Sequence, residues 1–400
     1  MLNRERTIYL VGIGNQNEPQ FSAEIRALIQ SGVYFSGGKR HHELVRQYLP
    51  ESSTWISIQG KMEQLIDSYR QVQSSLLIFV SGDPFFYGFG NTLKRLMPEA
   101  ILKAYPYFNS IQRLCHKTQT NYNRLEVVTV HGRPWSALDC VLIQDNPLIG
   151  VLTDKQKSPQ AIAQRMLDYG FTNYSITVGE ALDGADEHIG TYTLIECTQL
   201  AFADLNCVLL KRLTESPKGF GLPDTDFIPL NNRPNMMTKL PVRLMTLHAL
   251  QLKENQVFWD IGSCTGAVAI ETKRQYPTTE IIAFEKRLES EILIPNNAKR
   301  CSAPGIQVVI DDVFHLDLKT YPMPDVIFIG GHGNRLEELL HKLHIINPNA
   351  RLVTNAVTEN TNRIFVEVLT ALGYCLTETT IQVNNHNAIT IRTAELKQKK

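Results

Sequence analysis

Short apolar runs alternate with amphipathic stretches along almost the whole chain, a pattern typical of α/β proteins. In the first half, this pattern predicts helices over 24–31, 62–71 and 159–169. Towards the end of that half, 190–196 and 206–210 are predicted to be rich in strand, without a helix between them. The predicted strands of the first half are 8–13, 54–58, 76–80, 101–104, 125–129, 148–152 and 174–178.

The periodicity then breaks. Residues 216–223 and 231–234 are rich in Pro, Gly and Asn and follow neither a helical nor a strand period. We therefore place a linker at 212–235, between a domain of residues 1–211 and a domain of residues 236–400. The predicted strands of the second domain are 257–261, 280–284, 306–309, 326–329 and 351–355, followed by an antiparallel pair at 377–383 and 388–393.

Composition fits two soluble domains. A chain of 400 residues with 43% hydrophobic and 20% charged residues can build two cores. The 40 basic and 40 acidic residues cancel, which argues against a nucleic-acid partner. The seven cysteines form no CxxC pair, and no apolar run approaches the ~20 residues of a membrane span. We expect a cytoplasmic protein with no membrane partner and no metal site.

Four consecutive strand ends of the second domain carry glycine or acidic residues. A glycine loop at 260–266 follows the first strand, and Glu285 ends the second, where such sheets bind a ribose diol. Residues 311–313 end the third strand, in position to meet an adenine ring. His332, flanked by glycines, follows the fourth and is the candidate catalytic residue, with a structural loop as the alternative. The candidate cofactor contacts are Asp260, Gly262, Ser263, Cys264, Thr265, Gly266, Glu285, Asp312 and Val313.

NAD binding is the main alternative, but the GxGxxG pattern is missing. The segments 221–227, 237–243, 259–262, 328–331 and 355–358 together resemble the precorrin-6B C15-methyltransferase (decarboxylating) family. The resemblance implies a seven-stranded Rossmann-like methyltransferase fold that binds S-adenosyl-L-methionine, with Thr238 as a further contact. Two residues depart from the family pattern. Cys264 replaces a small residue and can crowd the methionine moiety, and Pro241 replaces a common acid.

The first domain carries a different set of motifs. These are Gly12-Ile-Gly14, the run 36–41, the run 81–88, Asn109-Ser110 and the run 131–133. Together they resemble the tetrapyrrole methylase superfamily, in its precorrin-7 C5-methyltransferase branch. The resemblance implies a two-lobed tetrapyrrole methylase fold with its own S-adenosyl-L-methionine site. Its expected cofactor contacts are Gly12, Gly14, Gly82, Asp83 and Ser110. For Asp83, the alternative is a purely structural role in the turn.

One departure concerns the glycine loop of this domain, where Asn15-Gln16 replaces the usual Pro-Gly turn. A second set of residues concerns the substrate. A corrinoid carries a ring of carboxylates, which Arg and Lys side chains can bind. For the basic run 39–42, a solvated helix start is the alternative. The candidate substrate contacts are Lys39, Arg40, His41, Arg133, Lys239 and Arg243.

Both resemblances concern the same precursor, so the chain resembles the fused precorrin-6Y C5,15-methyltransferase (decarboxylating) family of cobalamin biosynthesis. This implies methylation of a precorrin or cobalt-precorrin at C5 and C15, with loss of the C12 acetate carboxyl group as carbon dioxide. We expect an anionic corrinoid substrate, two S-adenosyl-L-methionine sites and a homo-oligomer. The alternative is that only the second domain is a methyltransferase, of a corrinoid, RNA or protein, and that the first is a substrate-binding scaffold.

Overall fold

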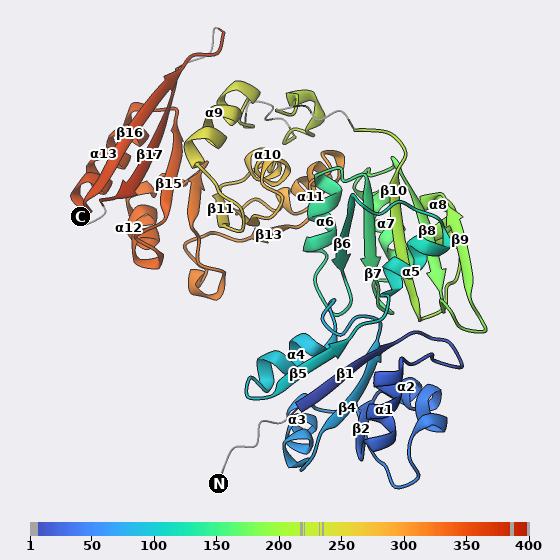
Figure 1. The fold of residues 1–400 in the computed structure, drawn as a ribbon. Helices are drawn as coiled ribbons and strands as arrows, with labels where there is room; N and C mark the ends of the chain where they lie inside the picture. Colours follow the sequence, from blue (N-terminus) through green and yellow to red (C-terminus); the bar gives the residue numbers. More distant parts are fainter. Residues whose placement is uncertain are drawn as a thin grey trace. The chain divides into compact units, whose positions relative to one another are not determined.

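The computed structural model describes residues 7–216, 219, 221–231, 233, 236–384 and 388–397 (Figure 1). The described chain forms two compact units. The first unit is drawn from 7–133, 147–163 and 175–211, and the second from 134–146, 164–174 and 212–397. Residues 217, 218, 220, 232, 234 and 235 of the predicted linker lie outside the described residues.

The first unit contains a parallel sheet with the strand order β3-β2-β4-β1-β5. Leu76–Val80 in its central strand are all buried, as expected for a parallel strand that is covered on both faces. The sequence did not predict the short strand β2. The elements of this lobe are β1 Thr7–Ile13, α1 Ala23–Ser31, β2 Tyr34–Gly37, α2 Lys39–Val45, β3 Thr54–Ser57, α3 Met62–Gln71, β4 Leu76–Ser81, α4 Phe89–Leu96 and β5 Ile101–Tyr105.

A second sheet has the order β6-β7-β10-β8-β9 and mixes parallel and antiparallel pairs. The prediction of no helix between β9 and β10 was wrong, because α8 lies there. Thr193 caps α8, and the Glu196 side chain accepts a hydrogen bond from the N–H of Thr193 in return. The elements are α5 Ser110–Lys117, β6 Leu125–Thr129, β7 Leu148–Leu152, α7 Pro159–Asp168, β8 Tyr174–Glu180, β9 His188–Tyr192, α8 Leu194–Gln199 and β10 Asn206–Arg212.

The second unit is built on a seven-stranded sheet in the order β13-β12-β11-β14-β15-β17-β16. Its first five strands are parallel, and β17 pairs antiparallel with both β15 and β16, as predicted for the closing pair. The chain order reverses between β11 and β14, which makes this the switch point where open α/β sheets bind ligands. The strands are β11 Val257–Ile261, β12 Glu280–Glu285, β13 Ile306–Ile310, β14 Val326–Ile329, β15 Arg351–Ala356, β16 Tyr374–Ile381 and β17 Ile389–Leu396.

Apolar clusters cover both faces of this sheet. Trp259 and Phe284 are fully buried in one cluster, and Phe258 and Val353 in the other, because neighbouring residues of a strand point to opposite faces. The helices of the unit are α6 Ser136–Ile143, α9 Leu240–Leu250, α10 Ala267–Gln275, α11 Ser290–Arg300, α12 Leu336–Ile346 and α13 Glu359–Ala371. Short 3₁₀ helices are η1 Arg46–Tyr48 in the first unit and η2 Asp224–Asp226 and η3 Leu318–Thr320 in the second.

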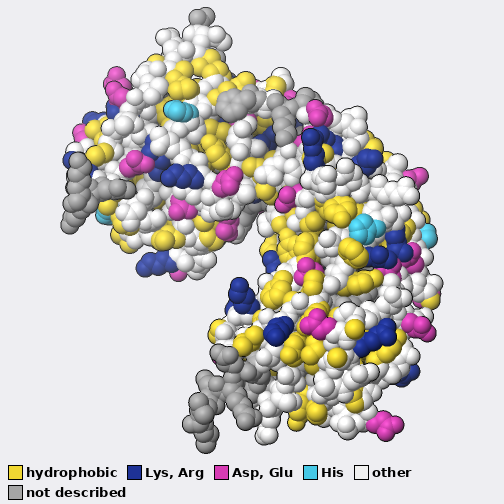
Figure 2. Space-filling view, in the orientation of Figure 1, with side chains coloured by type: hydrophobic (Ala, Val, Ile, Leu, Met, Phe, Trp, Pro, Cys, Tyr) yellow, Lys and Arg dark blue, Asp and Glu magenta, His cyan; other side chains and the backbone are white. Residues whose placement is uncertain are grey.

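Among the described residues, no helix combines the length and the apolar composition that crossing a bilayer requires. On the face drawn in Figure 2, basic and acidic side chains are interspersed rather than gathered by sign.

Candidate cofactor and substrate sites

A pocket of about 170 Å³ lies in the second unit at the carboxyl ends of β11 to β14. It is therefore at the switch point of the sheet, as the rule for open α/β sheets requires. Its walls are residues 261–262, 284–287, 311–314 and 331–333, together with Arg335.

Glu285 supplies a buried carboxylate to this pocket. The residue is 2% exposed, and its Oε2 accepts a hydrogen bond of 2.9 Å from the backbone N–H of Cys264. Its Oε1 accepts from the backbone N–H groups of Lys286 and Arg287, at 2.9 and 3.0 Å, and from the Arg287 side chain at 2.9 Å. Backbone donors at the strand end thus hold this carboxylate in one orientation.

Two glycines let the loops of the pocket approach each other. Gly262 has φ +75°, and a Cβ atom on it would lie 2.5 Å from the amide nitrogen of Gly331. A side chain at position 262 would therefore both strain the backbone and push the two loops apart. Because the two loops come so close, backbone rather than side chains lines this part of the pocket.

His332 lies on the β14 side of the pocket. Its Nε2 is 3.4 Å from Oγ1 of Thr361, and its buried Nδ1 has no hydrogen-bond partner among the described residues. Burial lowers the pKa of His332, so the imidazole is neutral at pH 7. The site therefore contains a neutral nitrogen base whose Nδ1 makes no protein hydrogen bond within the described chain.

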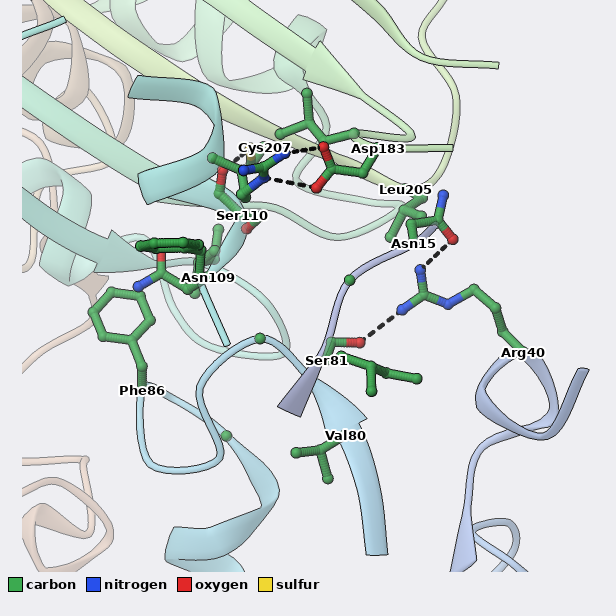
Figure 3. A pocket seen from close by; sticks show the side chains of 18 of the residues that line it. Asn15, Arg40, Val80, Ser81, Phe86, Asn109, Ser110, Asp183, Leu205 and Cys207 are labelled. Atoms are coloured by element: carbon green, nitrogen blue, oxygen red, sulfur yellow. Dashed lines mark hydrogen bonds and ion pairs between the residues drawn. The ribbon is translucent and has the colours of Figure 1, made fainter. Parts of the chain in front are cut away.

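The first unit contains a larger cavity of about 450 Å³, lined by residues from both of its sheets (Figure 3). Asn109 caps α5 beside this cavity, and its Oδ1 accepts from the N–H of Gln112 at 2.9 Å. Ser110 begins α5 there, so the N-terminus of that helix faces the cavity. The lining residues are 13–15, 38, 40–41, 58, 80–82, 86–89, 108–110, 113, 152, 179, 182–183 and 205–207.

Arg40 ties two loops of this cavity together. Its Nη1 donates to Oδ1 of Asn15 at 2.8 Å, and its Nη2 donates to Oγ of Ser81 at 2.7 Å (Figure 3). Nδ1 of His41 accepts from the N–H of Gly38 at 3.2 Å, which leaves the proton of the neutral ring on Nε2, 3.0 Å from Ser81. Burial, and then the Arg40 charge, lower the pKa of His41 to about 4. His41 is therefore neutral at pH 7.

A partly exposed ion-pair network lies at the opposite wall. Asp183 accepts from Nε of Arg113 at 2.7 Å and also pairs with Lys117 at 3.2 Å. Lys117 pairs in turn with Glu187 at 2.7 Å. Asp183 has φ +66°, which a non-glycine residue rarely adopts, and these partners hold it there.

Comparison with known proteins identifies the family of the chain. Residues 231–394 match the family model described as the precorrin methyltransferase domain. The chain is 30% identical over 368 residues, 91% of this chain and 88% of the relative, to a precorrin-6Y C(5,15)-methyltransferase (decarboxylating) of Sinorhizobium sp. The chain belongs to the precorrin-6Y C5,15-methyltransferase (decarboxylating) family.

Two proteins of Salmonella typhimurium resemble smaller parts of this family member. A cobalt-precorrin-6B C(15)-methyltransferase (decarboxylating) is 26% identical over 140 residues, 35% of this chain and 71% of that protein. A cobalt-precorrin-7 C(5)-methyltransferase is 24% identical over 183 residues, 45% of this chain and 87% of that protein.

Not every predicted contact of this precorrin methyltransferase family member lies at a pocket. In the second unit, Gly262, Glu285, Asp312, Val313 and His332 line the pocket. In the first unit, Gly14, Arg40, His41, Gly82 and Ser110 line the cavity. Among the described residues that line neither are Gly12, Lys39, Asp83, Arg133, Thr238, Lys239, Arg243, Asp260, Ser263, Cys264, Thr265 and Gly266.

Arg243 corrects a prediction most clearly. It was expected to hold a substrate carboxylate, but the residue is 0% exposed. Its guanidinium donates to Glu271 at 3.1 Å, to Asp224 at 3.2 Å and to the carbonyl oxygen of Thr238 at 2.8 Å. Arg243 therefore fastens the segment before α9 to α10 and presents no donor to a ligand.

Three other predicted contacts have structural roles, and a fourth is uncharged. The Asp83 carboxylate accepts from the N–H of Phe85 at 2.8 Å and so shapes the turn after β4. Asp260 is 1% exposed. Its carboxylate accepts from the Ser263 hydroxyl and from the N–H of Ala269, and so stabilises the glycine loop and the start of α10. Cys264 packs its side chain into a small apolar cluster away from the pocket lining. His41 lines the cavity, but its neutral ring cannot act as a cation at pH 7.

The sequence motifs did not reveal several residues that line the pockets. Asp183 and Arg113 lie 70 positions apart, and neither belongs to a recognisable motif. Arg287 and Arg335 line the second pocket without having been singled out. Of these residues, only Arg287 could have been found from the sequence, since it follows Glu285, the acid predicted to bind the ribose, by two residues.

Proposed function

We propose that the chain carries out both reactions of its family, with one methyl transfer in each unit. The first unit would methylate C5 of a precorrin, and the second would methylate C15 and release the C12 acetate carboxyl group. The observation that carries this proposal is the presence of two separate pockets, one in each unit. When bound, S-adenosyl-L-methionine supplies a methyl group that is already activated by its sulfonium charge.

The second pocket fits the adenosine part of that cofactor. Glu285 offers carboxylate oxygens for the ribose diol, and Asp312 and Val313 border the place expected for adenine. The close contact of Gly262 with Gly331 allows the ligand to approach the backbone. In the first unit, Gly14, Gly82 and Ser110 line the cavity of about 450 Å³, which is of ordinary size for a ligand site.

Catalysis in both units would rest mainly on positioning, because the methyl group needs no covalent enzyme nucleophile. Holding two reactants in line can supply roughly 7–11 kcal/mol of a barrier. Replacing a ring hydrogen by methyl also releases a proton, and neutral His332 can accept one in the second unit. We expect His332→Gln to slow that step about 10²-fold while binding of S-adenosylhomocysteine persists.

Arg40 is the cation proposed to contact a substrate carboxylate in the first unit, since it lines the cavity and carries a positive charge. The substrate would then be anionic, as expected for a corrinoid that carries a ring of carboxylates.

The deciding experiment is a titration of the intact chain with S-adenosylhomocysteine in a calorimeter. Two sites per chain support the proposal, with Glu285→Gln removing one of them. A single site that Glu285→Gln abolishes would contradict the two-reaction proposal. The first unit would then be a substrate-binding scaffold.

A further inference from the structure

The Arg287 side chain lies where a ligand of Glu285 is expected to bind. Its Nη1 is 2.9 Å from Oε1 of Glu285, and both residues line the second-unit pocket. The side chain of Arg287 is 29% exposed, whereas that of Glu285 is 1% exposed. The carboxylate is thus buried, and its charged partner lies on the solvent side of it.

The hydrogen bonds of Glu285 are shared unevenly between its two oxygens. Oε2 accepts from the N–H of Cys264, whereas Oε1 accepts from the N–H groups of Lys286 and Arg287 and from the Arg287 guanidinium. Each carboxylate oxygen offers about two lone-pair positions, so Oε2 has one position left and Oε1 has none. A diol that binds both oxygens therefore needs a position on Oε1. The N–H groups of Lys286 and Arg287 belong to the backbone after β12, and only the Arg287 side chain can move aside.

We propose that Arg287 is a displaceable internal ligand, whose guanidinium occupies a ribose-diol position of Glu285 and leaves when the cofactor binds. This inference rests on the proposed role of Glu285 as the diol acceptor. A buried carboxylate without a partner is costly, so Arg287 stabilises the pocket when no ligand is present. The same contact competes with the ligand and lowers its affinity.

The neighbouring cations cannot take this role. The Lys286 ammonium lies beside Gly333, 3.1 Å from where a Cβ atom of that glycine would be. Arg335 pairs with Glu338 and lies over the Phe314 ring, 3.6 Å from its centroid. Arg287 is the cation of this pocket that contacts Glu285 within the described residues.

The test compares S-adenosylhomocysteine binding to the full-length wild type, Arg287→Ala and the control Lys286→Ala. Hydrogen exchange reports each site separately, through residues 284–287 and 311–314 for the second unit and 108–113 for the first. We expect Arg287→Ala to bind about fivefold tighter in the second unit, because the ligand no longer has to displace a partly exposed guanidinium. Its ligand-free thermal midpoint should fall, and Lys286→Ala should change the affinity less.

The ribose diol allows a second test of the inference. The gain in Arg287→Ala should be smaller with the 2′-deoxy analogue of S-adenosylhomocysteine, which lacks one of the two competing hydroxyl groups. Unchanged or weaker binding of S-adenosylhomocysteine to Arg287→Ala would overturn the inference.

Glu285→Gln separates this failure from failure of the proposed function. If Glu285→Gln binds S-adenosylhomocysteine as tightly as the wild type, Glu285 is not the diol acceptor. Both the proposed role of Glu285 and the displacement of Arg287 are then wrong. If Glu285→Gln binds weakly while Arg287→Ala gains nothing, only the displacement by the ligand is wrong.

Discussion

At the residue scale, the most deeply buried charged groups are held by protein partners, and few of them face a ligand. Arg243, Glu271 and Asp260 are each at most 1% exposed. The sequence showed that charged residues gather near the strand ends, but not which of them are paired. Arg243 meets Asp224 and Glu271, which lie 19 and 28 positions away, and no local pattern reveals such a pairing.

Arg243→Ala should therefore destabilise the second unit rather than weaken substrate binding. The change leaves the Glu271 carboxylate buried without its cation, which typically costs about 3–5 kcal/mol of unfolding free energy. Urea unfolding would measure the loss. In Arg243→Met with Glu271→Leu, both charges are gone, and much of the loss should be recovered. A folded Arg243→Ala with wild-type stability and weakened substrate binding would restore the original substrate role.

Asp260 should make the stability of the second unit depend on pH. Burial raises the pKa of Asp260 to about 7, although hydrogen bonds from Ser263 and Ala269 oppose the shift. The folded pKa exceeds the unfolded value of about 3.9, so the folded protein binds this proton more tightly. Its contribution to stability is complete below pH 4 and is lost as the pH rises through about 7.

Asparagine cannot ionise, so Asp260→Asn should gain stability relative to the wild type as the pH rises from 5 to 7. The gain is at most about 1.4 kcal/mol per pH unit. Urea unfolding at pH 5, 6 and 7 gives the difference, with the exposed Asp317→Asn as control. A difference that stays constant over this range would show that Asp260 is already ionised in the folded protein.

At the element scale, the sequence predicted most strands, because buried parallel strands give continuous apolar runs bounded by breakers. Thr7–Ile13 and Leu76–Ser81 are examples. It missed Tyr34–Gly37, whose four residues are too few to show a period. It also missed Leu194–Gln199, although Thr193 and Glu196 form the capping box that marks such a helix start. There the β-rich composition of the preceding residues outweighed the cap.

Gly12→Ala tests how β1 and β4 meet at the first-unit cavity. A Cβ atom on Gly12 would collide with the carbonyl oxygen of Gly82 and lie 2.7 Å from the amide nitrogen of Tyr107. We expect the variant to lower the stability of the first unit by about 1–3 kcal/mol and to weaken its cofactor binding. Gly219→Ala is the control, because no atom of the described residues lies within 4 Å of its Cβ position. Equal thermal midpoints for the two variants would contradict this packing.

At the scale of the whole molecule, the motifs were informative about the family and less so about the walls of each pocket. Short motifs such as the glycine loop at 260–266 lie within one strand–turn–helix unit, so the sequence alone can show them. Walls such as Asp183 with Arg113 form only when distant segments meet. The second unit also takes segments from both sides of position 212, which a linear division cannot anticipate.

If each unit carries one reaction, single variants should separate the products. With a precorrin-6B-type substrate, the wild type should add two methyl groups and release one carbon dioxide. Gly12→Ala should favour a product with one methyl group that has lost the carboxyl group, because its defect lies in the first unit. Glu285→Gln should yield at most one methyl group and keep every carboxyl group, because C15 methylation and decarboxylation are proposed to share one bound pose. Mass spectrometry of the corrinoid distinguishes these outcomes. Loss of carbon dioxide at the wild-type rate in Glu285→Gln would show that decarboxylation does not depend on the second cofactor site.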